Sequence, residues 1–293
     1  MRHLLSCFSF TIYLCALPAD AQPSQQRPYR FAPIPMASEA QMTRTYLPFL
    51  SYLEQETGEA FELSYFASYQ DLLDAFTAGE VDLAYLGPLP YVVLRQQSDA
   101  VEPLVQLLDQ QGNSQYTCAI VKFLGPPEHH NSSRKVALTQ PLSTCGYLAM
   151  ETYFSRLGKS LEDTDIRYSF TGNHEQVALK VILGQFDLGS MKTRIAQRYQ
   201  HLGLRVIDQT APVPGFLLVA NRHTLPTETA DRIRSRLLAL QPLSSETDRR
   251  TVQSWSNNLR YGATPVELSP YDLIAEQWQQ IRADLLSEVH THD

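Results

Sequence analysis

The chain has 293 residues, of which 43% are hydrophobic and 19% charged, and its net charge is −7. This length and composition suit one large or two medium globular domains and exclude a disordered or fibrous chain. An acidic chain without a block of Lys and Arg residues is also a poor nucleic-acid binder, so we expect no nucleic-acid partner. If the ligand is an anion, local donors must hold it against the overall charge.

The first residues have the pattern of a secretory signal peptide. A short basic start precedes an apolar run at residues 4–18, and Ala19-Asp20-Ala21 supplies the small-x-small pattern that a signal peptidase reads. The apolar run is too short to span a bilayer stably. We therefore expect residues 1–21 to be a signal peptide cleaved near Ala21, and the mature chain to be a soluble protein of a bacterial periplasm.

Strands and helices alternate along the mature chain. In chain order the hydrophobic pattern predicts a strand at 30–35, a helix at 41–57, a strand at 61–66, a helix at 71–78 and a strand at 81–86, then strands at 116–123 and 135–139, a helix at 146–157, a helix ending before Gly184, strands at 186–190 and 216–220, and helices at 226–240 and 271–287. This alternation predicts an α/β protein with mainly parallel sheets covered by helices.

One stretch of the sequence has an echo 105 residues later. Residues 73–84 and 178–189 both read as an amphipathic helix stopped by Gly79 or Gly184, followed by a short strand that carries Asp-Leu. Such a repeat predicts two lobes of similar build. We expect the chain to cross twice between them, which makes a two-strand hinge and an interlobe cleft. The predicted lobes are 27–120 with 217–293, and 121–216.

Three positions are candidates for holding a ligand. Ser143-Thr144-Cys145-Gly146 lies between a predicted strand and a predicted helix, where free backbone N–H groups and two hydroxyls suit a phosphate-like group. An ordinary helix N-cap explains the same residues equally well. Tyr69 and His174 each stand ten residues before the glycine of their repeat, so we expect both to face the cleft, and each can donate a hydrogen bond.

These segments together resemble a known family. The chain is similar to the phosphate/phosphite/phosphonate-binding family of ABC-transporter periplasmic solute-binding proteins, over nearly the whole mature chain. The segments that carry the resemblance are 69–73, 79–88, 116–118, 143–147, 171–175 and 214–215. The resemblance implies a type II periplasmic binding protein fold, capture of a small oxyanion in the interlobe cleft, no cofactor and no enzyme activity. It further implies a monomer that works with the membrane permease of an ABC transporter.

The resemblance also implies a set of ligand contacts. Residues at the positions of Tyr69, Tyr116, Ser143, Thr144, Cys145 and His174 contact the anion's oxygens in that family. This chain departs from the family pattern at four positions. Cys118 and Cys145 stand where serine is common, and Arg194 and Phe216 stand where aminophosphonate binders place acidic residues. We therefore expect an aminoalkylphosphonate to be a poor ligand, because its ammonium group would meet a cation and an aromatic ring.

The two cysteines of the mature chain leave three alternatives open: a disulfide, a ligand-facing thiol, or incidental burial. A thiol at the site would favour a soft ligand such as arsenite or a sulfur oxyanion. The protein would then be a periplasmic sensor that signals to a membrane histidine kinase. A third hypothesis is an enzyme with Cys145 as nucleophile and His174 as base. Against it, the chain has no Gly-x-Ser-x-Gly motif, no P-loop and no metal-ligand spacing.

Overall fold

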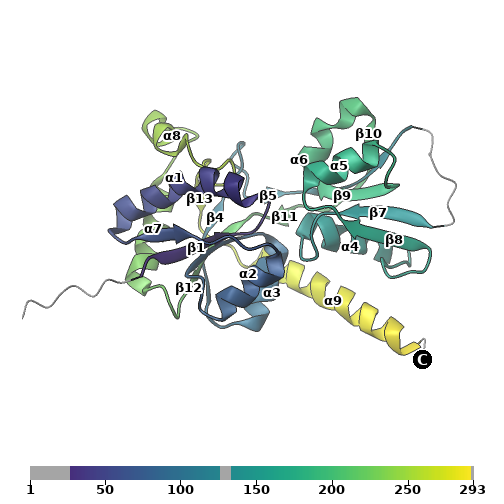
Figure 1. Ribbon diagram of the computed structural model, residues 1–293, viewed down its shortest axis with the longest axis horizontal. Helices are drawn as coiled ribbons and strands as arrows, with labels where there is room; N and C mark the ends of the chain where they lie inside the picture. The colour runs from purple at the N-terminus through teal and green to yellow at the C-terminus, as the bar shows by residue number, and fades with distance from the viewer. Residues whose placement is uncertain (1–26, 126–132, 292–293) are drawn as a thin grey trace, which may run out of the picture.

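The computed structural model describes residues 27–125 and 133–291, so the predicted signal peptide lies outside the described residues. The chain forms two α/β lobes, each built around its own sheet (Figure 1). In each sheet three strands at one end run parallel and the remaining pairs are antiparallel, so the sheets are mixed and not mainly parallel as predicted. Helices cover both faces of each sheet. In the described part of the chain, no helix is both long and apolar enough to cross a membrane.

The first lobe contains a six-stranded sheet in the order β13-β4-β12-β3-β1-β2. β1 runs parallel to both of its neighbours, whereas β12 is antiparallel to β3 and β4. One face is covered by α1, α7 and α8, and the other by α2, α3 and α9. The bounds of these elements are β1 Tyr29–Pro33, α1 Glu39–Thr57, β2 Phe61–Leu63, α2 Tyr69–Thr77, β3 Leu83–Leu86, α3 Pro88–Gln97, β4 Val101–Leu107, β12 Leu217–Asn221, α7 Thr227–Ala239, α8 Glu246–Val252, β13 Ala263–Thr264 and α9 Ser269–Thr291.

The second lobe contains a five-stranded sheet in the order β10-β6-β9-β7-β8. β7 runs parallel to β8 and β9, and β6 is antiparallel to β9 and β10. α4 covers one face, and α5 and α6 cover the other. The bounds are β6 Cys118–Phe123, β7 Arg134–Leu138, a π-helical turn Thr144–Leu148, α4 Ala149–Ser155, β8 Ile166–Phe170, α5 His174–Ile182, β9 Leu188–Lys192, α6 Thr193–Arg198, a 3-10 turn Gln200–Leu202 and β10 Leu204–Gln209.

The predicted repeat of 105 residues extends beyond the two segments first compared, from β1 to β3 in the first lobe and from β7 to β9 in the second. Adding 105 to the bounds of β1 and α2 gives the bounds of β7 and α5, and β3 plus 105 falls within β9. The two Asp-Leu motifs have the same structural role. Asp82 accepts from the backbone N–H of Arg30, and Asp187 accepts from that of Lys135, both at 2.7 Å. Asp82 thus ties the start of β3 to β1, and Asp187 ties the start of β9 to β7.

The chain crosses between the lobes at two short strands, β5 (Gln115–Tyr116) and β11 (Val213–Pro214), which pair with each other antiparallel. The single strand predicted at 116–123 is therefore two strands, because β5 pairs within the hinge and β6 joins the second sheet. Residues 118–120, which the sequence assigned to the first lobe, accordingly lie in the second sheet. The α9 helix runs alongside the hinge and contacts α3 and α4, one helix of each lobe (Figure 1).

Candidate functional site

A small cavity of about 20 Å³ lies between the lobes, where strands end and helices begin. The first residues of α2 and α5, the start of α3 and the π-helical turn all reach it, so free backbone N–H groups and the positive ends of helices converge there. Its lining residues are Ile34, Met36, Tyr69, Gly87, Pro90, Tyr116, Ser143, Thr144, Cys145, His174, Lys192 and Phe216.

The turn that carries Ser143 and Thr144 differs from the helix predicted at 146–157. The carbonyl oxygen of Ser143 accepts from the backbone N–H groups of both Tyr147, at 2.9 Å, and Leu148, at 3.2 Å, which gives a π-helical turn before α4. Gly146 allows this tight path, because a Cβ there would lie 2.1 Å from the hydroxyl oxygen of Thr139.

The hydroxyl groups of Ser143 and Thr144 are both oriented by backbone donors. Ser143 Oγ accepts from the N–H of Gly146 at 3.0 Å, and Thr144 Oγ1 accepts from the N–H of Leu89 at 3.0 Å. The second bond joins the two lobes, since Leu89 lies in the first turn of α3. Because its oxygen accepts a hydrogen bond from the backbone, the Ser143 hydroxyl is free to donate its own proton, whereas the Thr144 hydroxyl also hydrogen-bonds with Tyr116. Ser143 is thus a helix N-cap, as one of the two predicted alternatives required, and it also faces the cavity.

Tyr69 and His174 are the first residues of α2 and α5, and both line the cavity, as the repeat predicted. Burial raises the pKa of Tyr69, so its hydroxyl stays protonated. Burial, and after it the charge of Lys192, lowers the pKa of His174 to about 3. His174 Nδ1 accepts from the backbone N–H of Lys192 at 3.4 Å, which leaves the ring proton on Nε2. His174 is therefore a neutral donor.

Two aromatic rings and one lysine complete the wall. Lys192 Nζ lies 4.6 Å from the ring centroid of Tyr116 and 4.0 Å from that of Phe216, in cation–π contact with both. Phe216 in turn stacks on Tyr85, with ring centroids 5.0 Å apart. Burial raises the pKa of Tyr116, against the effect of a hydrogen bond that its oxygen accepts from Thr144. Both rings come from the segments that connect the two lobes, so these segments form part of the cavity wall.

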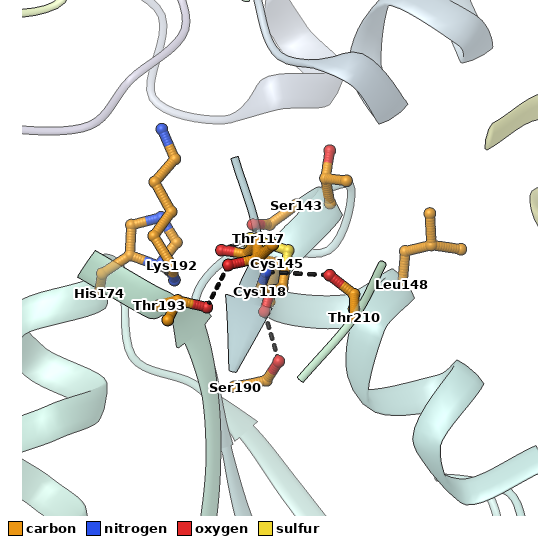
Figure 2. The surroundings of a disulfide bond; sticks show 12 residues. Thr117, Cys118, Ser143, Cys145, Leu148, His174, Ser190, Lys192, Thr193 and Thr210 are labelled. Atoms are coloured by element: carbon orange, nitrogen blue, oxygen red, sulfur yellow. Dashed lines mark hydrogen bonds between the residues drawn. A yellow bond between two sulfur atoms is a disulfide. The ribbon is translucent and has the colours of Figure 1, made fainter. Parts of the chain in front are cut away.

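Cys118 and Cys145 form a disulfide, with their Cα atoms 5.0 Å apart (Figure 2). The bridge fixes the π-helical turn to the start of β6, and Ser190 donates to the carbonyl oxygen of Cys145 beside it. Neither sulfur carries a thiol, so the hypotheses of a soft-ligand sensor and of a Cys145 nucleophile lose the group on which they depend. Cys118 is fully buried and does not line the cavity, and Cys145 reaches it only as half of the bridge.

Arg194 lies outside the small cavity. It lines a neighbouring, more open cleft of about 920 Å³, together with the 107–117 segment and residues Asn257 and Asn258 of the first lobe. The two cavities share Tyr116, Lys192 and Phe216 as a common wall. The prediction that Arg194 belongs to the immediate anion site is thus not matched by the geometry, because the side chain that enters that site is Lys192, two residues earlier.

Lys192 is the main lining residue that the sequence reasoning missed. The repeat contained the signal, because Gly87 plus 105 is Lys192, and both residues follow the last buried positions of equivalent strands. Gly87 has no side chain, and a Cβ there would lie 3.2 Å from the ring of Phe216. The absence of a side chain at Gly87 thus makes room for the ring of Phe216. At the equivalent position of the second lobe, Lys192 places its ammonium group near the same ring.

Comparison with known proteins decides the family. Residues 31–271 match the model of the ABC transporter phosphonate periplasmic substrate-binding proteins. The chain belongs to this family. Among curated proteins, the phosphate-import protein PhnD of Mycolicibacterium smegmatis is 27% identical over 222 residues, which are 70% of this chain and 69% of that protein.

Solved structures share the fold at low sequence identity. PhnD1 of Prochlorococcus marinus, in complex with methylphosphonate, is 16% identical with a TM-score of 0.72, and the match covers 87% of this chain and 98% of that chain. A binding component of an ABC phosphonate transporter from Pseudomonas aeruginosa is 18% identical with a TM-score of 0.67, covering 91% and 98%. The fold predicted from the sequence, a two-lobed type II periplasmic binding protein, is confirmed.

Proposed function

We propose that this member of the family captures a small oxyanion of the phosphate, phosphite or phosphonate class in the cavity between its lobes. The observation that carries the proposal is the convergence of donors from both lobes: Tyr69 from the first, Ser143, Thr144 and His174 from the second, and Tyr116 from the hinge. No Asp or Glu is among the residues that line the small cavity. The relatives named for phosphate import and solved with methylphosphonate support this ligand class.

We further infer that the mature protein works in the periplasm as a monomer, after cleavage near Ala21, and delivers its ligand to an ABC permease. The anion docks on Ser143, Thr144 and the N–H groups of the π-helical turn. Tyr69 then closes on it from the first lobe. Closure excludes water, which strengthens each polar contact, and it brings together surfaces of both lobes that a membrane partner can recognise.

The disfavoured ligand is an aminoalkylphosphonate. Its ammonium group would have to lie near Phe216, Lys192 and Arg194, which line the common wall and the adjoining cleft without a free carboxylate. Asp109, the one acidic residue of that cleft, accepts from the backbone N–H groups of Gln111 and Asn113.

The direct test is isothermal titration of the mature protein with phosphate, phosphite, methylphosphonate and 2-aminoethylphosphonate, with arsenite as the probe for a soft-ligand site. We expect one site per chain for at least one of the first three ligands, and at least tenfold weaker binding of 2-aminoethylphosphonate. No binding of phosphate, phosphite or methylphosphonate, or binding of arsenite alone, would contradict the proposal.

A further inference from the structure

Lys192 is the only residue with a cationic side chain that lines the small cavity. It is the last residue of β9, and its side chain extends past the imidazole of His174 toward the first lobe (Figure 2). Lys192 is half-buried, and an ammonium group withdrawn from water is costly unless a carboxylate or another anion faces it.

The groups around Lys192 do not supply that anion. Its ammonium faces the rings of Tyr116 and Phe216, and His174 beside it is neutral. Tyr69 and Tyr85, on α2 and β3, are phenols whose pKa is raised by burial. Arg194, in the first turn of α6, is a second cation, and Glu175 of α5 is the one carboxylate whose charge acts on Lys192. In the described part of the chain, the ion pair of Glu175 is with Arg198.

These neighbours determine how readily Lys192 gives up its proton. Burial, and after it the charge of Arg194, lowers the pKa of Lys192 to about 7, with Glu175 opposing. An anion in the cavity would stabilise the ammonium form directly, and cation–π contacts alone replace a carboxylate only in part.

The other polar groups of the cavity also favour an anionic ligand that has no proton to donate. The hydroxyl oxygens of Ser143 and Thr144 already accept from backbone N–H groups, and His174 Nδ1 accepts from that of Lys192. The cavity therefore offers donors and one cation, whereas no carboxylate lines it to accept a hydrogen bond from a ligand O–H group. A ligand O–H meets only neutral hydroxyl oxygens there, which accept more weakly than a carboxylate.

We propose that Lys192 is the charge partner of the ligand, that the site selects doubly charged tetrahedral oxyanions without an O–H group, and that the protein takes up a proton when such an anion binds. This inference rests on the proposed function and narrows its ligand class to dianions such as phosphite and methylphosphonate. Hydrogen phosphate, which carries one O–H, binds more weakly than these two.

The test measures proton uptake by titrating phosphite and methylphosphonate at pH 9, in two buffers of different ionisation enthalpy. At pH 9 both ligands are fully deprotonated and Lys192 is mostly neutral, so we expect uptake of about one proton per anion bound. Lys192→Arg keeps a permanent charge, so it should bind both anions without proton uptake. Lys192→Met should bind at least tenfold more weakly at pH 7, and the matched control Lys122→Met, an exposed lysine of β6, should match the wild type.

A second measurement needs no ligand. The folded-state pKa of Lys192, about 7, lies below its ordinary value of 10.5, so the unfolded chain holds more protons between these pH values and stability rises with pH across that window. Lys192→Met should lack this rise relative to Lys122→Met. Zero proton uptake by the wild type, or Lys192→Met binding within threefold of the wild type, would overturn the inference. If neither the wild type nor Lys122→Met binds any of the anions, the proposed function itself fails.

Discussion

At the scale of single residues, Ser143 and Thr144 share one feature, a hydroxyl oxygen that accepts a hydrogen bond from a backbone N–H group. Each hydroxyl oxygen accepts a backbone N–H, Ser143 from its own turn and Thr144 from Leu89 of the opposite lobe. Ser143 is thereby left with a proton to donate, and an anion competes with Tyr116 for the proton of Thr144. Donation to a charged oxygen contributes about 1.5–3 kcal/mol.

We therefore expect Ser143→Ala and Thr144→Val each to weaken phosphite or methylphosphonate binding by about 10- to 100-fold, the equivalent of that energy. Thr144→Val should also lower the melting temperature, since Leu89 N–H loses its acceptor. Ser155→Ala, at the exposed end of α4, is the control and should change neither quantity. Isothermal titration with a parallel thermal melt checks this, and unchanged affinity in both cavity variants would contradict the assigned site.

His174 gives the protein a specific acid sensitivity. Its folded-state pKa of about 3 lies below its ordinary value of 6.5, so between these values the unfolded chain binds one more proton than the folded chain. Stability must then fall as pH decreases through that window, by up to about 1.4 kcal/mol per pH unit. We expect His174→Gln to show a shallower fall than the wild type in urea unfolding between pH 7 and pH 4. Parallel curves for the two proteins would show that His174 is not held neutral.

Some residues of the candidate site can be predicted from the sequence, and others cannot. Tyr69 and His174 were found because their positions relative to a helix-ending glycine repeat in both lobes. Lys192 was overlooked because a strand-end lysine is normally an exposed side chain, and nothing local indicates that hinge aromatics cover it. The cysteine pairing depends on a contact between β6 and a turn 27 residues away, which no local pattern reports.

At the scale of elements, the π-helical turn and the disulfide form one unit. The turn aims Ser143 and Thr144 at the cavity, while the bridge and the Ser190 contact hold it on β6. A crosslink with a sequence separation of 27 stabilises a folded chain by about 3 kcal/mol in the loop-entropy account.

We expect the double variant Cys118→Ala/Cys145→Ala to melt about 6–12 °C below the wild type and to bind the anion more weakly, because the turn is no longer fixed. Reductant should lower the melting temperature of the wild type and leave that of the variant unchanged. Equal melting temperatures in non-reducing buffer would show that the bridge contributes nothing to stability.

Several elements resisted prediction for identifiable reasons. Pro88 and Pro90 make the start of α3 read as a loop, yet both lie in its first turn, where a missing N–H costs nothing. The predicted 116–123 strand is divided because its first residues pair across the hinge. The helix predicted at 41–57 does end before Gly58, which adopts a φ of 76° at the end of α1. Local capping signals thus predict the ends of helices well, whereas features set by pairing between distant segments cannot be predicted from local sequence.

At the scale of the whole molecule, α9 braces both lobes. Tyr271 donates to the hinge carbonyl of Gly215 at 2.9 Å, and Gln277 donates to Thr152 of α4 at 2.7 Å. Trp278 packs edge-on against Tyr147, which belongs to the turn that carries Ser143. The repeat predicted two similar lobes, but a helix that links them after the second crossing has no counterpart in the repeat, so the sequence did not indicate its role.

Trp278 should therefore report ligand binding. We expect phosphite or methylphosphonate to change tryptophan emission in the wild type, and the change to be absent in Trp278→Phe. The other tryptophan of the chain, Trp255, is buried in the core of the first lobe and serves as the internal reference. An unaltered response in Trp278→Phe would mean that closure does not reach α9.

The central claim is that an oxyanion lies in the small cavity and is held by both lobes at once. A crystal structure of the mature protein grown with methylphosphonate in a phosphate- and sulfate-free solution tests it most directly. We expect the anion within hydrogen-bonding distance of Ser143, Thr144 and Tyr69, with Lys192 Nζ as its charge partner. An anion bound only at Arg194 in the open cleft, or no anion between the lobes at saturating concentration, would contradict it.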